Sequence, residues 1–76
     1  MELNDFIKNF ANEFEMTDAS EITPATHYRE LEEWDSLLGL AIIGMINNKY
    51  HVKVTGAEIK DGGTVENLFN LVKSRL

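Results

Sequence analysis

The chain has 76 residues, 43% of them apolar and 26% charged, so we expect one folded domain over residues 1–76, without the second core or large walled pocket that an enzyme needs. It contains no cysteine, which excludes thiol nucleophiles, Cys-based zinc sites and disulfides and agrees with a reducing cytosol. The formal charge of −6 opposes binding to nucleic acid or anionic lipid, because clustered Lys and Arg hold such polyanions.

Residues 2–16 are predicted to form the first helix, and residues 17–33 a long loop. The helix is predicted from apolar side chains at the three-and-four spacing of an amphipathic helix: Leu3, Phe6, Ile7, Phe10, Ala11 and Phe14. The loop is predicted from the loss of that period and from turn-forming Thr, Asp, Ser and Pro residues. We expect Ile22, Tyr28 and Leu31 to anchor it to the core. Loops of more than roughly 12–15 residues are often functional.

A second helix is predicted from Asp35, its N-cap, to about Tyr50. One side of this helix is predicted to face the core and gathers Ile42, Ile43, Ile46 and Tyr50. The opposite side is also nearly free of charge, so we expect a partner to cover it at times; it gathers Leu37, Leu38, Ala41, Met45 and Asn48. Gly39 and Gly44 are unfavourable inside a helix, which indicates that backbone or ligand approaches closely there.

The remaining residues predict an extended linker at 52–54, a single helical turn at 56–60 and a last helix capped by Thr64. The last helix again has the three-and-four apolar spacing, at Val65, Leu68, Phe69, Val72 and Leu76. The predicted fold class is therefore all-α. We expect a small four-helix bundle with three main helices, one short helix and the long loop between the first two.

Ser36 is the candidate functional residue. It directly follows the N-cap, so its hydroxyl is expected to be exposed in the first turn of the second helix, at the positive end of the helix dipole. A phosphate ester is favoured there even without a neighbouring Lys or Arg, since free backbone N–H groups bind anions. An Asp-Ser pair before a helix is, however, most often only a cap.

Three segments together resemble the acyl carrier protein family. Residues 32–37, Glu-Glu-Trp-Asp-Ser-Leu, are similar to the family's Asp-Ser-Leu attachment motif. Residues 50–54, Tyr-His-Val-Lys-Val, are similar to the segment that follows the family's second helix, and residues 63–68, Gly-Thr-Val-Glu-Asn-Leu, to the opening of its last helix. The resemblance covers nearly the whole chain and rests on the combination of motifs.

The resemblance implies a carrier without catalytic activity of its own. It assigns Ser36 the covalent 4'-phosphopantetheine, derived from coenzyme A, Asp35 a role in presenting the serine to the phosphopantetheinyl transferase, and Leu37 a place on the enzyme-facing surface. The thiol of the arm would hold acyl or aminoacyl groups as thioesters. The implied partners are that transferase and enzymes that activate, condense or transfer acyl groups. We expect the carrier itself to be a monomer.

The second helix departs from the pattern of fatty-acid carriers. Positions that tend to be acidic in those proteins are neutral here, namely Leu38, Ala41, Asn47 and Asn48. All the Asp and Glu residues lie in residues 2–35 or 58–66. We therefore expect a specialised carrier whose partners dock by apolar contact on Leu37, Leu38, Ala41 and Met45.

An unmodified helical docking module, which binds a partner through the same apolar face, is the alternative function. Other functional classes are disfavoured because the sequence lacks the residues that they require. His27 and His51 are isolated, so no metal-ligand spacing is present, and no Gly-x-Ser-x-Gly elbow accompanies Ser36. A DNA-recognition helix would need to be basic, whereas the second helix offers only Lys49 near its end.

Nothing in the sequence predicts targeting to a membrane. The first residues lack the basic and apolar stretches of a signal peptide. The most apolar run, residues 37–46, is shorter than the about 20 residues that span a bilayer. We expect a cytoplasmic protein.

Overall fold

A computed structural model describes residues 1–76 and confirms the all-α prediction. It has four α-helices, α1 (Leu3–Ala11), α2 (Ser36–Tyr50), α3 (Gly56–Asp61) and α4 (Val65–Ser74), and two 3-10 turns, η1 (Ala19–Glu21) and η2 (Tyr28–Glu30). The only β-type pairing is an isolated bridge between His27 and Thr64. None of the helices combines the length and the apolar character needed to cross a bilayer.

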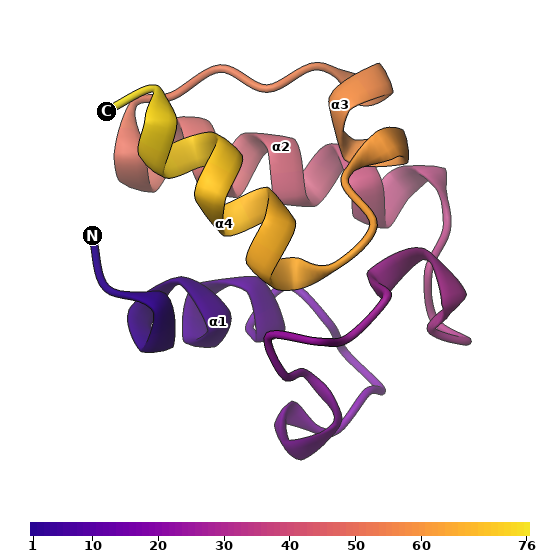
Figure 1. Ribbon diagram of the computed structural model, residues 1–76. Coiled ribbons are helices and arrows are strands. Elements are labelled where there is room, and N and C mark those ends of the chain that lie inside the picture. The colour runs from indigo at the N-terminus through magenta and orange to yellow at the C-terminus, as the bar shows by residue number, and fades with distance from the viewer.

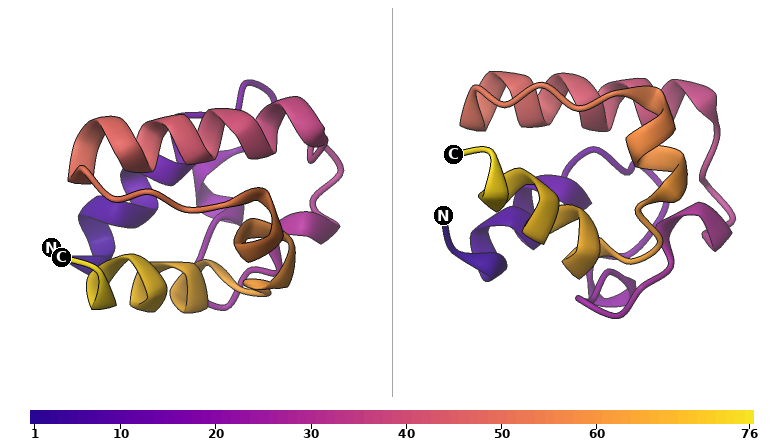
Figure 2. Two further views of the ribbon diagram at one scale, coloured as in Figure 1. Left: turned by 90° about the horizontal axis from the view of Figure 1, so that it is seen from above. Right: turned by 45° about the horizontal axis from the view of Figure 1, so that its top comes forward.

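The helices form a bundle in which α2 contacts both α1 and α3, and α1 also contacts α4 (Figure 1). The two termini lie close together at one end of the molecule (Figure 2). The long segment between α1 and α2 extends along the opposite end, where α2 begins. The N-terminus of α2 therefore lies beside this segment and beside α3.

The first helix is shorter than predicted, because it ends at Ala11 rather than at residue 16. Backbone bonding then changes to the tighter i→i−3 pattern, and Phe14 N–H donates to the carbonyl of Ala11 over 3.0 Å. The next three N–H groups donate to the side chain of Glu33 instead of to helical carbonyls. Phe14 still reaches the core. The apolar periodicity thus continues past the end of the helix, where a tertiary contact with Glu33 holds residues 15–17.

The hydrophobic core consists of 16 buried side chains, and the largest fully buried ones come from α1, α2, α4 and the long loop. Ile22 and Tyr28 of the loop are buried and Leu31 is partly buried, which confirms the three predicted anchors. No buried side-chain nitrogen or oxygen atom lacks a hydrogen-bond partner. The core is thus apolar, with Tyr28 supplying its main polar atom.

Tyr28 joins the long loop to α3. Its hydroxyl donates a hydrogen bond to the backbone carbonyl of Ile59, and its ring packs against Phe10 and Trp34, with centroids 5.6 and 5.1 Å apart. Burial raises the pKa of Tyr28 to about 12. A Cβ atom on Gly62 would overlap the Tyr28 hydroxyl, so a glycine is required for this approach.

The C-terminal elements follow the prediction. Val52 and Val54 are buried along an extended linker while Lys53 between them is exposed. Thr64 caps α4, since its hydroxyl accepts a hydrogen bond from Asn67 N–H over 3.1 Å. Leu76 differs from its predicted core position, because α4 ends at Ser74 and the Leu76 side chain is exposed.

Replacing Gly62 by Ala is expected to lower the free energy of unfolding by about 1–3 kcal/mol, since the new methyl group displaces the Tyr28 ring. Urea denaturation of Gly62→Ala and of the Tyr28→Phe/Gly62→Ala pair measures the effect. In the Tyr28→Phe background the same substitution should cost less, because the overlapped oxygen is gone.

Gly44→Ala is the matched control. Gly44 lies exposed within α2 and a Cβ there meets nothing within 4 Å, so the substitution should stabilise the protein by about 0.5–1 kcal/mol. A Gly62→Ala protein as stable as the wild type would contradict the role given to Tyr28.

Candidate functional site

Ser36 is the first residue of α2 and is exposed, as predicted. Asp35 precedes it in an extended conformation as the N-cap, and its Oδ1 accepts a hydrogen bond from Leu38 N–H over 2.8 Å. The Asp35 carbonyl accepts the first helical bond, from Gly39 N–H over 3.0 Å. The cap therefore fixes where the helix begins, and so fixes the place of the serine hydroxyl.

The tip of α2 favours an anion. The backbone N–H groups of Ser36 and Leu37 donate to no acceptor within the chain. They point out of the helix at its positive end, so they can bind phosphate oxygens. The Ser36 hydroxyl makes no hydrogen bond to the protein, which leaves it accessible to another molecule.

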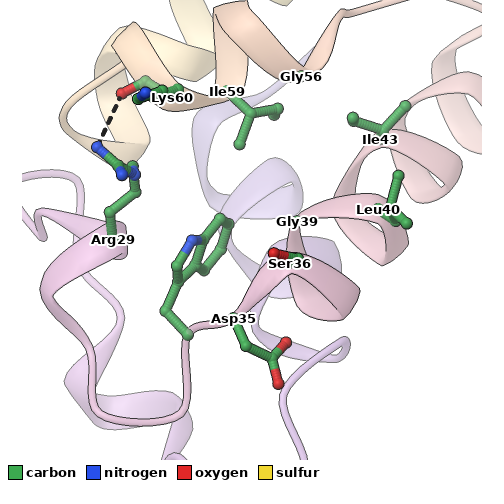
Figure 3. A pocket seen from close by; sticks show the side chains of 10 residues that line it. Arg29, Asp35, Ser36, Gly39, Leu40, Ile43, Gly56, Ile59 and Lys60 are labelled. Atoms are coloured by element: carbon green, nitrogen blue, oxygen red, sulfur yellow. Dashed lines mark hydrogen bonds between the residues drawn. The ribbon is translucent and has the colours of Figure 1, made fainter.

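An open hollow of about 480 Å³ lies beside Ser36, between the start of α2, η2 and α3 (Figure 3). Arg29 and Lys60 lie together on one side of it, and Leu40 and Ile43 lie along α2 on the other. Arg29 Nη1 donates a hydrogen bond of 3.4 Å to the Lys60 carbonyl, which connects η2 to α3. The full lining is Arg29, Trp34, Asp35, Ser36, Gly39, Leu40, Ile43, Gly56, Ile59 and Lys60.

The two glycines of α2 have different surroundings. A Cβ on Gly39 would lie 3.5 Å from Cζ2 of Trp34, which is an ordinary van der Waals distance to a side chain and not the close approach of backbone or ligand that the sequence analysis expected. The same expectation for Gly44 is wrong, because open space surrounds it. No contact within the chain therefore requires a glycine at either position of α2.

The predicted partner face of α2 is only partly exposed. Leu37 is 75% exposed, but Leu38 and Met45 are 8% and 5% exposed and belong to the core, so their assignment to an exposed face was wrong. Ala41 is partly buried at the edge of the exposed face. The exposed stripe, which we call the α2 stripe, consists of Leu37, Leu40, Gly44, Asn47 and Asn48.

The difference between the predicted and the observed exposed face of α2 has a physical cause. Apolar side chains surround α2, so periodicity alone does not distinguish the buried sectors from the exposed one. Contacts with α1 and α3 bury more of the circumference than a single core face. Leu40, with 64% of its side chain exposed, is the residue that the sequence analysis missed on this face.

Four other residues near the site were also missed. Arg29, Trp34 and Lys60 line the hollow, and Glu33 binds the segment before Ser36 to residues 15–17. Arg29, Glu33 and Lys60 act through residues distant in sequence, so local spacing did not indicate their roles. For Trp34, its place directly before Asp35 and Ser36 was the only signal in the sequence that it lies at the site.

A family model described as "Phosphopantetheine attachment site" matches residues 5–72. The match covers most of the chain, including Ser36 and every helix in whole or in part. No curated protein and no solved structure gives a match.

Replacing Asp35 by Ala is expected to lower the free energy of unfolding by about 0.5–2 kcal/mol, because Leu38 N–H loses its acceptor. Asp35→Asn keeps a side-chain oxygen acceptor and should stay close to the wild type. Urea denaturation of the three proteins measures the difference, and equal stability of all three would show that the cap does not fix the start of α2.

Proposed function

The chain belongs to the phosphopantetheine attachment-site family, whose members carry 4'-phosphopantetheine covalently, and from this premise we propose that Ser36 is the attachment residue. A carrier domain makes no bonds itself. The arm's thiol holds acyl or aminoacyl groups as thioesters and presents them to partner enzymes at a high effective concentration. The protein is thus an acyl carrier protein of a specialised kind.

The observation that supports this proposal is the position of Ser36 among the serines of the chain. Ser36 lies at the positive end of the longest helix with its hydroxyl unbonded. Ser74 lies at the negative end of α4 and donates to the Leu71 carbonyl over 2.6 Å, and Ser20 lies in a three-residue turn. Only Ser36 combines an accessible oxygen with the free N–H groups at the start of an α-helix, where a phosphodiester is favoured.

The neighbouring residues have separable roles in this function. Asp35 holds the start of α2 and keeps Ser36 in its first turn. The Ser36 and Leu37 N–H groups lower the energy of the phosphodiester that forms when the Ser36 oxygen loses its proton and displaces adenosine 3',5'-bisphosphate from the pyrophosphate bond of coenzyme A. Arg29 and Lys60 are the cations of the adjoining hollow, and Leu40 contributes to its apolar part.

Partner enzymes are proposed to dock on the α2 stripe through Leu37 and Leu40. The stripe contains no acidic residue, so it offers no opposite charge to attract a basic partner surface. Two exposed leucines next to the modified serine instead supply apolar contact at the centre of an interface. The same stripe would also suit an unmodified docking module, which is the alternative function.

Incubation with coenzyme A and a phosphopantetheinyl transferase separates the two functions. The intact mass of the wild-type protein should rise by one phosphopantetheinyl group, and Ser36→Ala should abolish the gain. Ser20→Ala is the matched control and should be modified like the wild type. A folded wild-type protein that gains no mass would favour the docking module.

Leu40→Glu is expected to raise the KM of the transferase for this carrier about tenfold, because about 1–2 kcal/mol of apolar contact is lost. Leu76→Glu is the matched control, since both leucines are 64% exposed and Leu76 lies at the end of the chain far from Ser36 in sequence. Steady-state modification kinetics on the two variants measure the difference. An equal KM for both would exclude Leu40 from the docking surface.

A further inference from the structure

The carboxylate of Glu33 binds a loop that lies far away in sequence. Its Oε2 accepts a hydrogen bond from Glu15 N–H over 2.7 Å. Its Oε1 accepts from Met16 N–H over 2.9 Å and from the N–H and hydroxyl of Thr17 over 2.8 and 2.7 Å. Three consecutive N–H groups and one hydroxyl thus converge on one side chain, in the manner of a backbone anion nest.

These hydrogen bonds select the ionised form of Glu33. The pKa of Glu33 lies below its usual value, chiefly because of the hydrogen bond from Glu15 N–H, with further contributions from Thr17 and Met16. Charged acceptors make stronger hydrogen bonds than neutral ones. The neighbouring Glu32 is exposed and makes no hydrogen bond, so the interaction belongs to one of two adjacent glutamates.

Glu33 anchors the residues that lead into Ser36. Between η2 and α2 the backbone makes one internal hydrogen bond, from Trp34 N–H to the Leu31 carbonyl over 3.0 Å. Glu33 fixes this segment on one side of Trp34, and the Asp35 cap fixes it on the other. Trp34 lies between them with its ring against Phe14 and Tyr28.

If Glu33 served only to end α1, this arrangement of hydrogen bonds would not be explained. A helix C-terminus leaves carbonyl groups unpaired, whereas Glu33 accepts from N–H groups beyond the end of the helix. The contact joins residues separated by 16 to 18 positions. Its effect is to hold the segment before Ser36 against the loop after α1.

We propose that Glu33 is a positioning residue for the modification of Ser36: it holds residues 33–35 in the arrangement in which the transferase binds the start of α2. This inference rests on the proposed attachment at Ser36. If the binding-competent arrangement is only fractionally populated, the apparent affinity falls by that fraction, whereas turnover of the bound complex is unchanged. Loss of Glu33 should therefore raise KM and leave kcat nearly constant.

Modification kinetics with coenzyme A and a phosphopantetheinyl transferase test the proposal on folded full-length proteins. Glu33→Ala should raise the KM for the carrier about tenfold, with kcat within about twofold of the wild type. The KM of Glu33→Gln should lie between those of Glu33→Ala and the wild type. Its carbonyl oxygen can still accept hydrogen bonds from Met16 and Thr17, but its amide group cannot accept one from Glu15 N–H. Glu32→Ala makes the same change of charge one residue away and should match the wild type.

A purely structural role would lower the melting temperature without this KM change. The kinetics are therefore measured at a temperature at which circular dichroism shows every variant folded. If Glu33→Ala does not fold, Thr17→Ala replaces it, since it removes one hydrogen bond without changing the charge and should raise KM about twofold. A KM for the folded Glu33 or Thr17 variants equal to that of Glu32→Ala overturns the inference, whereas an unmodified wild type overturns the proposed function itself.

Discussion

The hydrogen bond from the buried Tyr28 hydroxyl to the Ile59 carbonyl is the contact on which the rest of the structure depends. It attaches the long loop to α3, and it brings the Tyr28 ring between Phe10 of α1 and Trp34. The loop then contributes to the core as a helix would, and three of its apolar residues pack there. Without this attachment, the hollow beside Ser36 would lose the wall that η2 and α3 supply.

The start of α2 combines a fixed backbone with an accessible hydroxyl. The carboxylates of Glu33 and Asp35 both accept hydrogen bonds from backbone N–H groups, so the two acidic side chains next to Ser36 are held in fixed positions by the protein. The remaining N–H groups of the first turn stay available. The proposed attachment at Ser36 depends on this combination, because partner enzymes would have to find the serine, and later the arm, in the same place on each encounter.

The part of α2 that stays exposed in the bundle is also its proposed docking surface. Leu38, Ile42, Met45 and Ile46 are buried in a helix that contacts both α1 and α3, which leaves only a narrow stripe exposed. That stripe has two large apolar side chains beside Ser36 and neutral residues further along. Apolar contact of this kind depends little on salt, whereas attraction between charged surfaces weakens as ionic strength rises.

The sequence by itself determined the helices, the N-caps at Asp35 and Thr64, and the position of Ser36 in the first turn of α2, because capping and periodicity act over a few residues. Only the tertiary structure decided that α1 ends at Ala11 and that the N–H groups of residues 15–17 donate to Glu33 instead of to helical carbonyls. It also decided that Leu40 is exposed while Leu38 and Met45 are buried. A helix with apolar residues all round has no preferred face until its neighbours pack against it, so long-range contact alone could settle that choice.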